Sequence, residues 1–232
     1  MGERSIKLNP MYGHANSALG QALISQGRLT EALAAIRRRA ELYPEGHRDR
    51  AAAEAHRAYC ESLIALDGRL AAVLRGTDRP VDDRECLRFS TLCQVKKRYA
   101  AAVRFATEAF THAPMLAENL RAHARYDAAC AAAQAGCGLG DDAATLSDAE
   151  RGRWRKQARE WLQADLNAWS KFLDGNPSNR LRTGKAMAHW QVDPDLARLR
   201  ERIAIGVLAE GERNECVALW AEVAAVLARA EK

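Results

Sequence analysis

His47, Arg48 and Asp49 form the tripeptide with which the catalytic loop of protein kinases begins. In that loop, H-R-D-x-x-x-x-N, the aspartate accepts the substrate hydroxyl proton and the asparagine binds magnesium. The asparagine position holds Glu54, and the chain has no glycine-rich phosphate loop, no Val-Ala-Ile-Lys strand and no Asp-Phe-Gly motif. The tripeptide is therefore predicted to start an ordinary helix, where an aspartate interacts favourably with the helix dipole. No catalytic residue and no enzymatic activity are predicted.

Cysteine is the other residue type here that could do chemistry. The six cysteines include no CxxC or CxxxH pair, and they are Cys60, Cys86, Cys93, Cys130, Cys137 and Cys216. The pairs 86/93 and 130/137 lie two helical turns apart, which is roughly 10 Å by helix rise and too far to share one metal ion. We interpret the cysteines as small buried hydrophobic residues in a reducing cytosol. No metal and no other cofactor is predicted.

The composition indicates the elements that would position these residues. The chain has 232 residues, of which 48% are hydrophobic but only 6% aromatic. Alanine, leucine, arginine and glutamate dominate, and they are strong helix formers, so an all-α fold is predicted. No apolar run is long enough to span a membrane, and the N-terminus lacks the apolar core of a signal peptide. A cytoplasmic protein without a membrane partner is expected.

The charge is only mildly basic. A net charge of +5 results from 35 basic and 30 acidic residues. The densest basic runs, 37–39 and 96–98, are each followed by acidic or apolar residues and do not extend into a stripe. They are interpreted as solvated helix faces, and a nucleic-acid partner is the weaker alternative.

The prolines indicate an internal repeat. Pro10, Pro44, Pro80 and Pro114 are separated by 34, 36 and 34 residues. Units of this length are typical of helix–turn–helix repeats, and proline suits the joins because it cannot sit inside a helix that has just ended.

The first unit, about residues 11–44, shows the internal pattern. Leu19 and Gly20 begin a face of small residues, Gly27 ends the first helix, and Ala32 is small where a second helix would cross the first. This segment resembles a tetratricopeptide repeat in its Leu-Gly pair, glycine turn, alanine and terminal Pro44. It departs from that pattern at Asn16, where the family has an aromatic residue, and at Arg39, where it has alanine.

Further units follow with weaker matches. The unit 81–114 repeats the scheme through Tyr99, Ala102, Ala109 and Pro114, with Lys97 in place of the turn glycine. The unit 45–80 is degenerate: 48–66 is predicted as one long helix, and Gly68 and Gly76 bracket a short second one. The segment 115–136 is predicted as the first helix of a fourth unit, so that repeats occupy 1–136. The prediction is a helix-hairpin solenoid.

The region 148–232 is predicted to complete and cap the solenoid. After a loop over 137–146, Ser147 and Glu150 form a capping box for a helix over about 148–174. A shorter helix carries Met187 and Trp190, and a last helix covers about 212–230. Apolar residues recur on the long helix at helical spacing and are interpreted as core. They are Trp154, Trp161, Leu162, Leu166, Trp169 and Leu173.

A narrower resemblance covers residues 48–231. Strings such as RYDAACAAAQAG, HWQVDPDLARLRE and LWAEVAAVLARA resemble the C-terminal tails of bacterial multidomain proteins, including serine/threonine protein kinases. This resemblance implies an alternative function as the regulatory or docking segment of a kinase whose catalytic domain is not in this chain. Residues 6–10 resemble the last turn of a preceding repeat helix, so the exposed end of the array is expected to offer a surface for self-association.

The tetratricopeptide resemblance implies a non-catalytic scaffold that binds a protein or peptide in a concave groove. The Arg84 and Arg88 pair resembles part of a carboxylate clamp, so the partner is expected to be acidic. Ordinary solvation of these polar side chains is the competing interpretation. By the family's pattern the groove residues are His14, Ser17, Gln21, Arg84, Arg88, Thr91, His123, Tyr126, Asp127 and Gln134.

Overall fold

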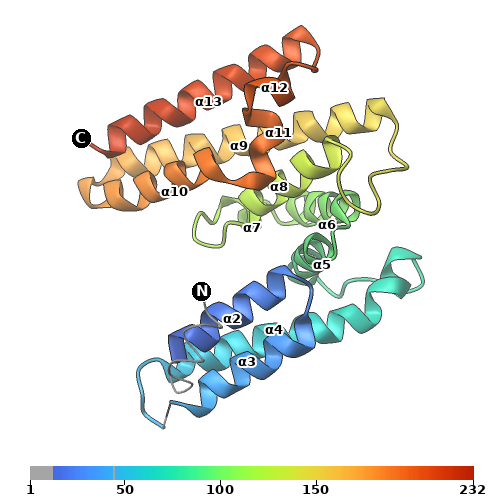
Figure 1. The fold of residues 1–232 in the computed structure, drawn as a ribbon, viewed down its shortest axis with the longest axis vertical. Coiled ribbons are helices and arrows are strands. Elements are labelled where there is room, and N and C mark those ends of the chain that lie inside the picture. Colours follow the sequence, from blue (N-terminus) through green and yellow to red (C-terminus); the bar gives the residue numbers. More distant parts are fainter. Residues whose placement is uncertain (1–12, 44) are drawn as a thin grey trace. The chain divides into compact units, whose positions relative to one another are not determined.

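A computed structural model describes residues 13–43 and 45–232, and every regular element in these ranges is a helix (Figure 1). The all-α prediction is therefore confirmed for this part of the chain. The chain divides into two compact units, Met1–Pro80 and Val81–Lys232. The predictions for residues 6–10, Pro10 and Pro44 lie outside the described residues. None of the described helices combines the length and the apolar character that crossing a bilayer requires.

In the first unit the structure describes three helices, in which α3 packs against both α2 and α4. Their bounds are Gly13–Ser25 for α2, Leu29–Glu41 for α3 and Arg50–Leu74 for α4. At the crossing of α2 and α3, a Cβ atom on Gly20 would lie 2.5 Å from Ile36 Cγ1. Ala32 and Ile36 are fully buried there. The small residues in the repeat pattern thus allow the close helix contact that was predicted from them.

The turn between α2 and α3 has the geometry that favours glycine. Gly27 has a φ of 73°, and the Arg28 N–H reaches back to the Leu23 carbonyl at 2.9 Å. This is the Schellman arrangement, in which a left-handed residue closes the end of a helix. The predicted role of Gly27 is confirmed.

Helix α4 corrects the prediction for the degenerate unit. It runs without a break through Gly68, although a helix end was expected there, and it ends at Leu74 just before Gly76. A single glycine inside a helix costs only about 1 kcal/mol relative to alanine. The burial of Cys60, Leu63 and Leu70 on one face outweighs that cost. The tripeptide at 47–49 immediately precedes α4, as predicted.

The second unit begins with a hairpin of the same design. Helix α5 spans Asp83–Val95 and α6 spans Tyr99–His112. Lys97 occupies the position of Gly27 with a φ of 55°, and the Arg98 N–H bonds the Cys93 carbonyl at 2.7 Å. Ser90 stands at the helix crossing and donates a hydrogen bond to the Ala102 carbonyl at 2.9 Å. The predicted turn therefore forms without glycine.

The predicted helix over 115–136 is in fact two helices. A single turn, α7, spans Met115–Glu118, and α8 spans Ala124–Gly136. His123 precedes α8 with a φ of 56°, a left-handed conformation that a continuous helix cannot contain. Helix α8 packs on both α6 and α9, and all of its alanines after Ala124 are almost completely buried. A helix covered on several sides needs such small residues to let its neighbours approach.

The loop after α8 caps the start of α6. The Asp142 carboxylate accepts hydrogen bonds from the backbone N–H groups of Ala100 and Ala101, at 3.1 and 2.8 Å. The Asp141 N–H donates to the Lys97 carbonyl at 2.8 Å, where Gly140 packs too closely for a Cβ atom. This loop therefore satisfies N-terminal donors of α6 that would otherwise lack partners.

Three long helices complete the second unit, and each packs against the other two (Figure 1). They are α9 (Asp148–Gly175), α10 (Arg180–Val192) and α13 (Glu210–Ala230). The capping box of Ser147 and Glu150 at the start of α9 is confirmed. Leu162, Leu166 and Trp169 are buried as predicted, and Trp154 and Trp161 are half-buried.

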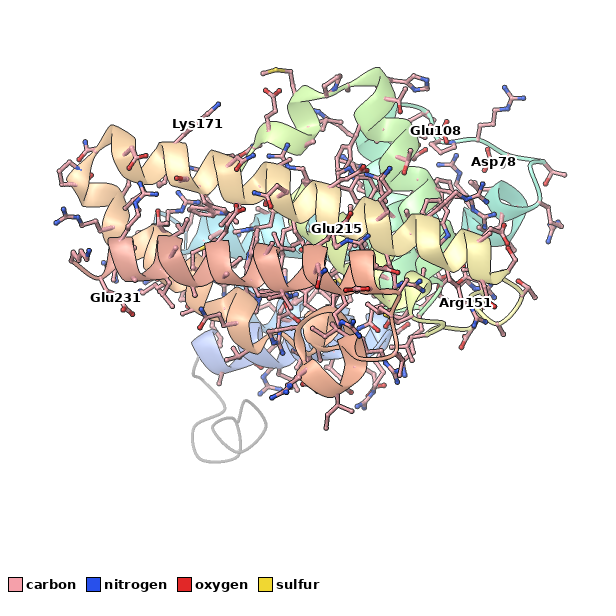
Figure 2. All side chains as sticks on the ribbon, turned by 90° about the horizontal axis from the view of Figure 1, so that it is seen from above. Asp78, Glu108, Arg151, Lys171, Glu215 and Glu231 are labelled. Carbon is pink, nitrogen blue, oxygen red and sulfur yellow. The ribbon has the colours of Figure 1, made fainter. Side chains whose placement is uncertain are left out.

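Short elements that the sequence analysis did not predict connect these helices. They are η1 (Pro177–Asn179), η2 (Pro194–Leu196), α11 (Ala197–Arg200) and α12 (Arg202–Ile205). Ion pairs join α9 to α13: Glu212 accepts from both Arg155 and Arg159 at 2.7 Å, and Arg159 also bonds Glu215. Figure 2 shows α13, on which Glu215 is labelled, running alongside α9. These contacts hold α13 alongside the first half of α9.

Candidate binding site

The predicted groove residues of the first unit lie on α2. Gln21 is exposed and Ser17 is half-buried, whereas the side chain of His14 lies outside the described part of the structure. Neither described side chain takes part in a cluster of polar groups. This helix offers ordinary solvated polar residues and no evident binding feature.

The predicted arginine pair of the groove lies on α5. Arg84 and Arg88 are exposed one turn apart, and among the described residues neither guanidinium has a hydrogen bond or ion pair. Thr91 is half-buried and donates its hydroxyl hydrogen to the Leu87 carbonyl at 3.1 Å. The two arginines are therefore free to bind an anion, while the threonine hydroxyl is engaged by its own helix.

Two of the groove residues predicted on α8 form hydrogen bonds with other side chains of the same protein. The buried Tyr126 hydroxyl donates to Asp193 Oδ2 at 2.6 Å, and the Gln134 amide donates to Asp195 Oδ1 at 2.7 Å. The segment that begins η2 thus covers this face of α8. Tyr126 and Gln134 are therefore engaged in internal packing. The segment that covers the expected groove face is distant in sequence, so this contact was not predicted.

The other two predicted residues of α8, His123 and Asp127, are exposed. Water reaches the Asp127 carboxylate, but the surrounding protein displaces part of its hydration shell. This partial burial, together with the negative charges of Asp165, Asp193 and Asp195, raises the pKa of Asp127 to about 7. Burial also raises the pKa of Asp165, although the Arg125 guanidinium 2.7 Å away opposes the shift.

These carboxylates do not form a metal site, since no group of three or more potential ligands in the described ranges has a suitable arrangement. Asp193 and Asp195 are bonded to side chains of α8, and Asp165 is paired with Arg125. Within this cluster, the inward-facing carboxylates mainly join α8 to α9 and η2.

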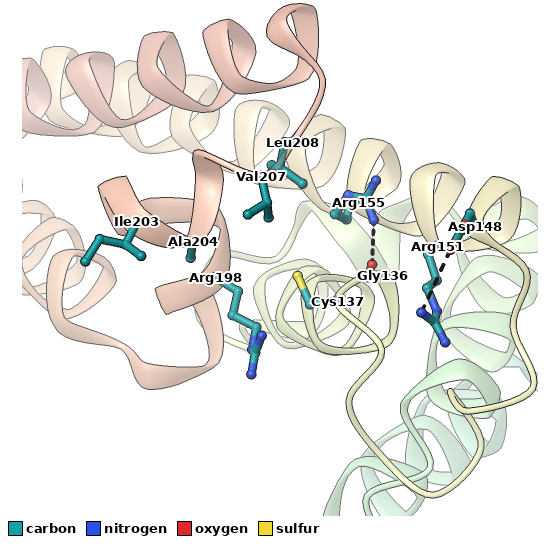
Figure 3. A pocket seen from close by; sticks show the side chains of 10 residues that line it. All are labelled: Gly136, Cys137, Asp148, Arg151, Arg155, Arg198, Ile203, Ala204, Val207 and Leu208. Atoms are coloured by element: carbon teal, nitrogen blue, oxygen red, sulfur yellow. Dashed lines mark hydrogen bonds and ion pairs between the residues drawn. The ribbon is translucent and has the colours of Figure 1, made fainter.

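An open cavity lies beside the C-terminal end of α8. It has a volume of about 400 Å³ and is bounded by the first turns of α9 and by the segment 198–208 (Figure 3). Its lining residues are Gly136, Cys137, Asp148, Arg151, Arg155, Arg198, Ile203, Ala204, Val207 and Leu208. The volume falls within the range of ligand pockets, about 300–1,000 Å³.

The close packing of α8 on α9 fixes one wall of the cavity. A Cβ atom on Gly136 would lie 2.7 Å from the Arg155 backbone nitrogen and 2.9 Å from the Arg151 carbonyl oxygen. Arg155 donates to the Gly136 carbonyl at 2.8 Å and is also bound to Glu212. Arg155 is thus fully engaged and holds this wall in place.

The opposite wall is apolar and exposed. Ile203, in α12, is 91% exposed, and Val207, in the segment that leads from α12 to α13, is 87% exposed. Figure 3 shows Val207 and Ala204 on this side of the cavity, above Arg198 and Cys137, whereas the Ile203 side chain extends outward from α12. Neighbouring exposed apolar side chains at the edge of a concave surface are a feature of interaction sites.

Two arginines at the rim of the cavity have unused hydrogen-bonding capacity. Among the described residues, exposed Arg198 has no hydrogen bond or ion pair. Arg151 has a buried Nε without a partner, and its ion pair to the exposed Asp148 is long, at 3.9 Å. The cavity therefore combines an apolar wall with available positive charge.

Cys137 lies at the base of this cavity (Figure 3). Burial raises the pKa of its thiol to about 11, and the positive charges of Arg155 and Arg198 only partly oppose that shift. At neutral pH the sulfur is protonated, and a protonated thiol is a poor nucleophile.

The sequence analysis did not identify this cavity. Its apolar wall comes from the run IAIGVL at 203–208, which has no clear helical or strand periodicity and was not assigned to an element. Five apolar residues around a glycine between two charged helices were the available signal. A comparison with known protein families, with curated proteins and with solved structures finds no match for this chain.

Proposed function

We propose that the chain is a non-catalytic protein-interaction module and that the cavity between α8, α9 and α12 is its peptide-binding site. The observation that carries this proposal is the exposure of Ile203 and Val207, at 91% and 87%, on the wall of a cavity of about 400 Å³. Covering such side chains stabilises a complex by about 25 cal/mol for each Å² of apolar surface removed from water.

The chemistry of the described side chains supports a binding role. Burial raises the pKa of the cysteine thiols, to about 12 for Cys86 and Cys93, which disfavours the reactive thiolate. The Asp49 carboxylate lies 3.8 Å from the Arg48 guanidinium, at the start of α4. These groups have the environments of structural residues.

The local geometry of the hairpins supports tetratricopeptide-like repeats. The turns at Gly27 and Lys97 share the same pair of backbone hydrogen bonds, and helices α2 and α5 each have 13 residues. Small residues, Ala32 and Ala102, stand fully buried at equivalent places in the second helix of each hairpin. We propose that both hairpins belong to one repeat array, whose groove includes Arg84 and Arg88.

The proposal is tested with a displayed library of random peptides, selected on the full chain. Selection on the wild type is expected to enrich binding sequences. The variants Ile203→Asp and Val207→Asp are expected to lose these binders, because each places a charge on the apolar wall. Both side chains are so exposed that neither change affects folding.

Leu181→Asp is the matched control. It introduces the same charge at an apolar residue that is 71% exposed on α10, outside the cavity, and it is expected to retain the binders. Failure to enrich any peptide, or equal binding by all four proteins, would contradict the proposed site.

A further inference from the structure

The charge at the cavity rim is unbalanced. Arg198 has no partner among the described residues, and Arg151 has a 3.9 Å ion pair to Asp148 and a 3.5 Å hydrogen bond to the Ala143 carbonyl. Arg155, in contrast, is neutralised by Glu212 at 2.7 Å. The only acidic side chain that lines the cavity in the described structure is Asp148, which is fully exposed and 3.9 Å from Arg151. An exposed ion pair of this length contributes little to stability. The charge of Arg151 is therefore available to a ligand.

The positive charge lies next to the apolar wall. Arg198 is on α11, five residues before Ile203, and it acts on the Cys137 sulfur at the base of the cavity. Figure 3 shows Arg198 beside Cys137, with Ala204 and Val207 above it and Arg151 on the far side. A ligand that reaches the apolar wall therefore meets a guanidinium at the same time.

The shape favours a peptide over a small molecule. Pockets for small molecules bury most of the ligand surface, typically about 70–90%. Here the apolar wall is itself almost completely exposed, so a small carboxylate would leave it in contact with water. A partner segment with an extended surface covers the wall and still presents a charged group to the rim.

From this arrangement, and resting on the proposed function, we infer the chemistry of the partner. We propose that the cavity binds an acidic–apolar peptide segment, in which one large aliphatic or aromatic side chain packs against Ile203 and Val207. An aspartate or glutamate next to it pairs with Arg198. An arginine presents a planar pair of donors that matches a carboxylate, which gives this contact its specificity.

The inference is tested with three pools of short synthetic peptides of equal length. Every peptide has a central Leu, Ile, Phe or Met, flanked by Asp and Glu in the first pool, Asn and Gln in the second, and Lys and Arg in the third. The fluorescence anisotropy of labelled pools measures their binding to the full chain. The acidic pool is expected to bind about tenfold more tightly than the neutral pool, and the basic pool more weakly still.

The arginine variants identify the contact. Arg198→Glu is expected to remove the preference for the acidic pool and to favour the basic pool. Arg180→Glu makes the same charge change at an exposed residue of α10 that does not line the cavity, and it is expected to keep the acidic preference. Arg198→Lys keeps the charge without the planar donors and is expected to retain part of the affinity.

The outcomes separate this inference from the proposed function. If the three pools bind equally and Val207→Asp still abolishes binding, the cavity binds peptides but the inferred acidic chemistry is wrong. If no pool binds although the displayed library yields binders at the cavity, the inference also fails while the function stands. Octanoate that competes with the acidic pool at equal concentration would show a small-molecule site and overturn the assignment to a peptide.

Discussion

At the scale of single residues, the acidic side chains of the second unit have distinct roles set by their neighbours. Asp142 binds two backbone N–H groups at the start of α6, Asp165 is paired with Arg125, and Asp127 is exposed beside three other carboxylates. Asp127 was predicted to lie in a peptide groove, and no prediction concerned Asp142 or Asp165. Their partners lie about 40 residues away in sequence, at 41, 42 and 40 positions.

Asp127 is expected to make stability depend on pH. Its pKa in the folded protein is about 7, above the value of about 3.9 for an unfolded chain, so the folded state binds this proton more tightly. Stability is therefore expected to fall as pH rises from about 4 to about 7. Above about pH 7, Asp127 should cause no further change in stability.

Asp127→Asn is expected to remove this dependence. The variant should be more stable than the wild type at pH 8 by about 1 kcal/mol, a value kept small because solvent screens the exposed carboxylate. At pH 4 the two proteins should have equal free energies of unfolding, as measured by urea denaturation. Asp127→Glu keeps the carboxylate and should behave like the wild type. If Asp127→Asn increases the stability equally at pH 4 and pH 8, the charge of Asp127 is not the cause.

Asp142 is expected to stabilise the second unit as a cap supplied from a distant loop. Asp142→Ala leaves the N–H groups of Ala100 and Ala101 without their acceptor and should cost about 1–2 kcal/mol in the free energy of unfolding. Asp141→Ala is the control, because Asp141 contacts α6 through its backbone N–H, which the change preserves. A smaller loss for Asp142→Ala than for Asp141→Ala would refute the capping role.

At the scale of elements, the crossing of α8 and α9 is the contact on which the cavity depends. Gly136→Ala places a Cβ atom 2.7 Å from a backbone nitrogen of α9, so the helices must separate. This overpacking should cost about 1–3 kcal/mol and weaken peptide binding.

Gly184→Ala tests whether this effect is specific to the crossing. A Cβ atom on Gly184, inside α10, would meet only Ala230 Cβ at an ordinary 3.7 Å. Alanine there should stabilise the helix by up to about 1 kcal/mol, because it is the better helix former. Thermal unfolding of both variants gives the comparison, and a stable Gly136→Ala protein would contradict the described packing.

Much of the helical organisation could be predicted from the sequence, because local signals determine it. The Gly27 turn, the Ser147 capping box and the apolar stripe of α9 each depend on residues within a few positions of one another. The break at His123 and the continuity of α4 through Gly68 could not be predicted in this way. Both are decided by tertiary packing, which overrides weak local propensities.

The candidate site was mostly beyond prediction from sequence. Arg84 and Arg88 are exposed as expected, because a repeat pattern assigns helix faces directly. Tyr126 and Gln134 are covered by η2, and the cavity joins α8 to a segment more than 60 positions later in the chain. Contacts between residues so far apart in the chain produce no periodic pattern in the amino-acid sequence.

At the scale of the whole molecule, the second unit has the components of an independent domain. It has its own buried residues, among them Phe89, Leu162 and Trp169, and the Asp82 side chain caps its first helix at Glu85. The prediction that the chain is the tail of a larger kinase stays a prediction, as does a single continuous solenoid.

A fragment of residues 81–232 is expected to fold alone. Its circular dichroism should show a helical spectrum and a single cooperative thermal transition, because the helices that bury its core all lie within these residues. It should also keep the peptide binding of the full chain, since every residue lining the cavity belongs to it. A fragment without a cooperative transition would show that the second unit depends on the first.

The most direct measurement follows the methyl groups of the apolar wall by NMR while the peptides enriched by library selection are titrated into the full chain. The proposed binding site predicts that the methyl signals of Ile203 and Val207 shift first and most strongly, together with signals near Arg198. Methyl groups of Leu181 on α10 should stay unchanged. Shifts confined to other helices, with Ile203 and Val207 unaffected at saturation, would contradict the account.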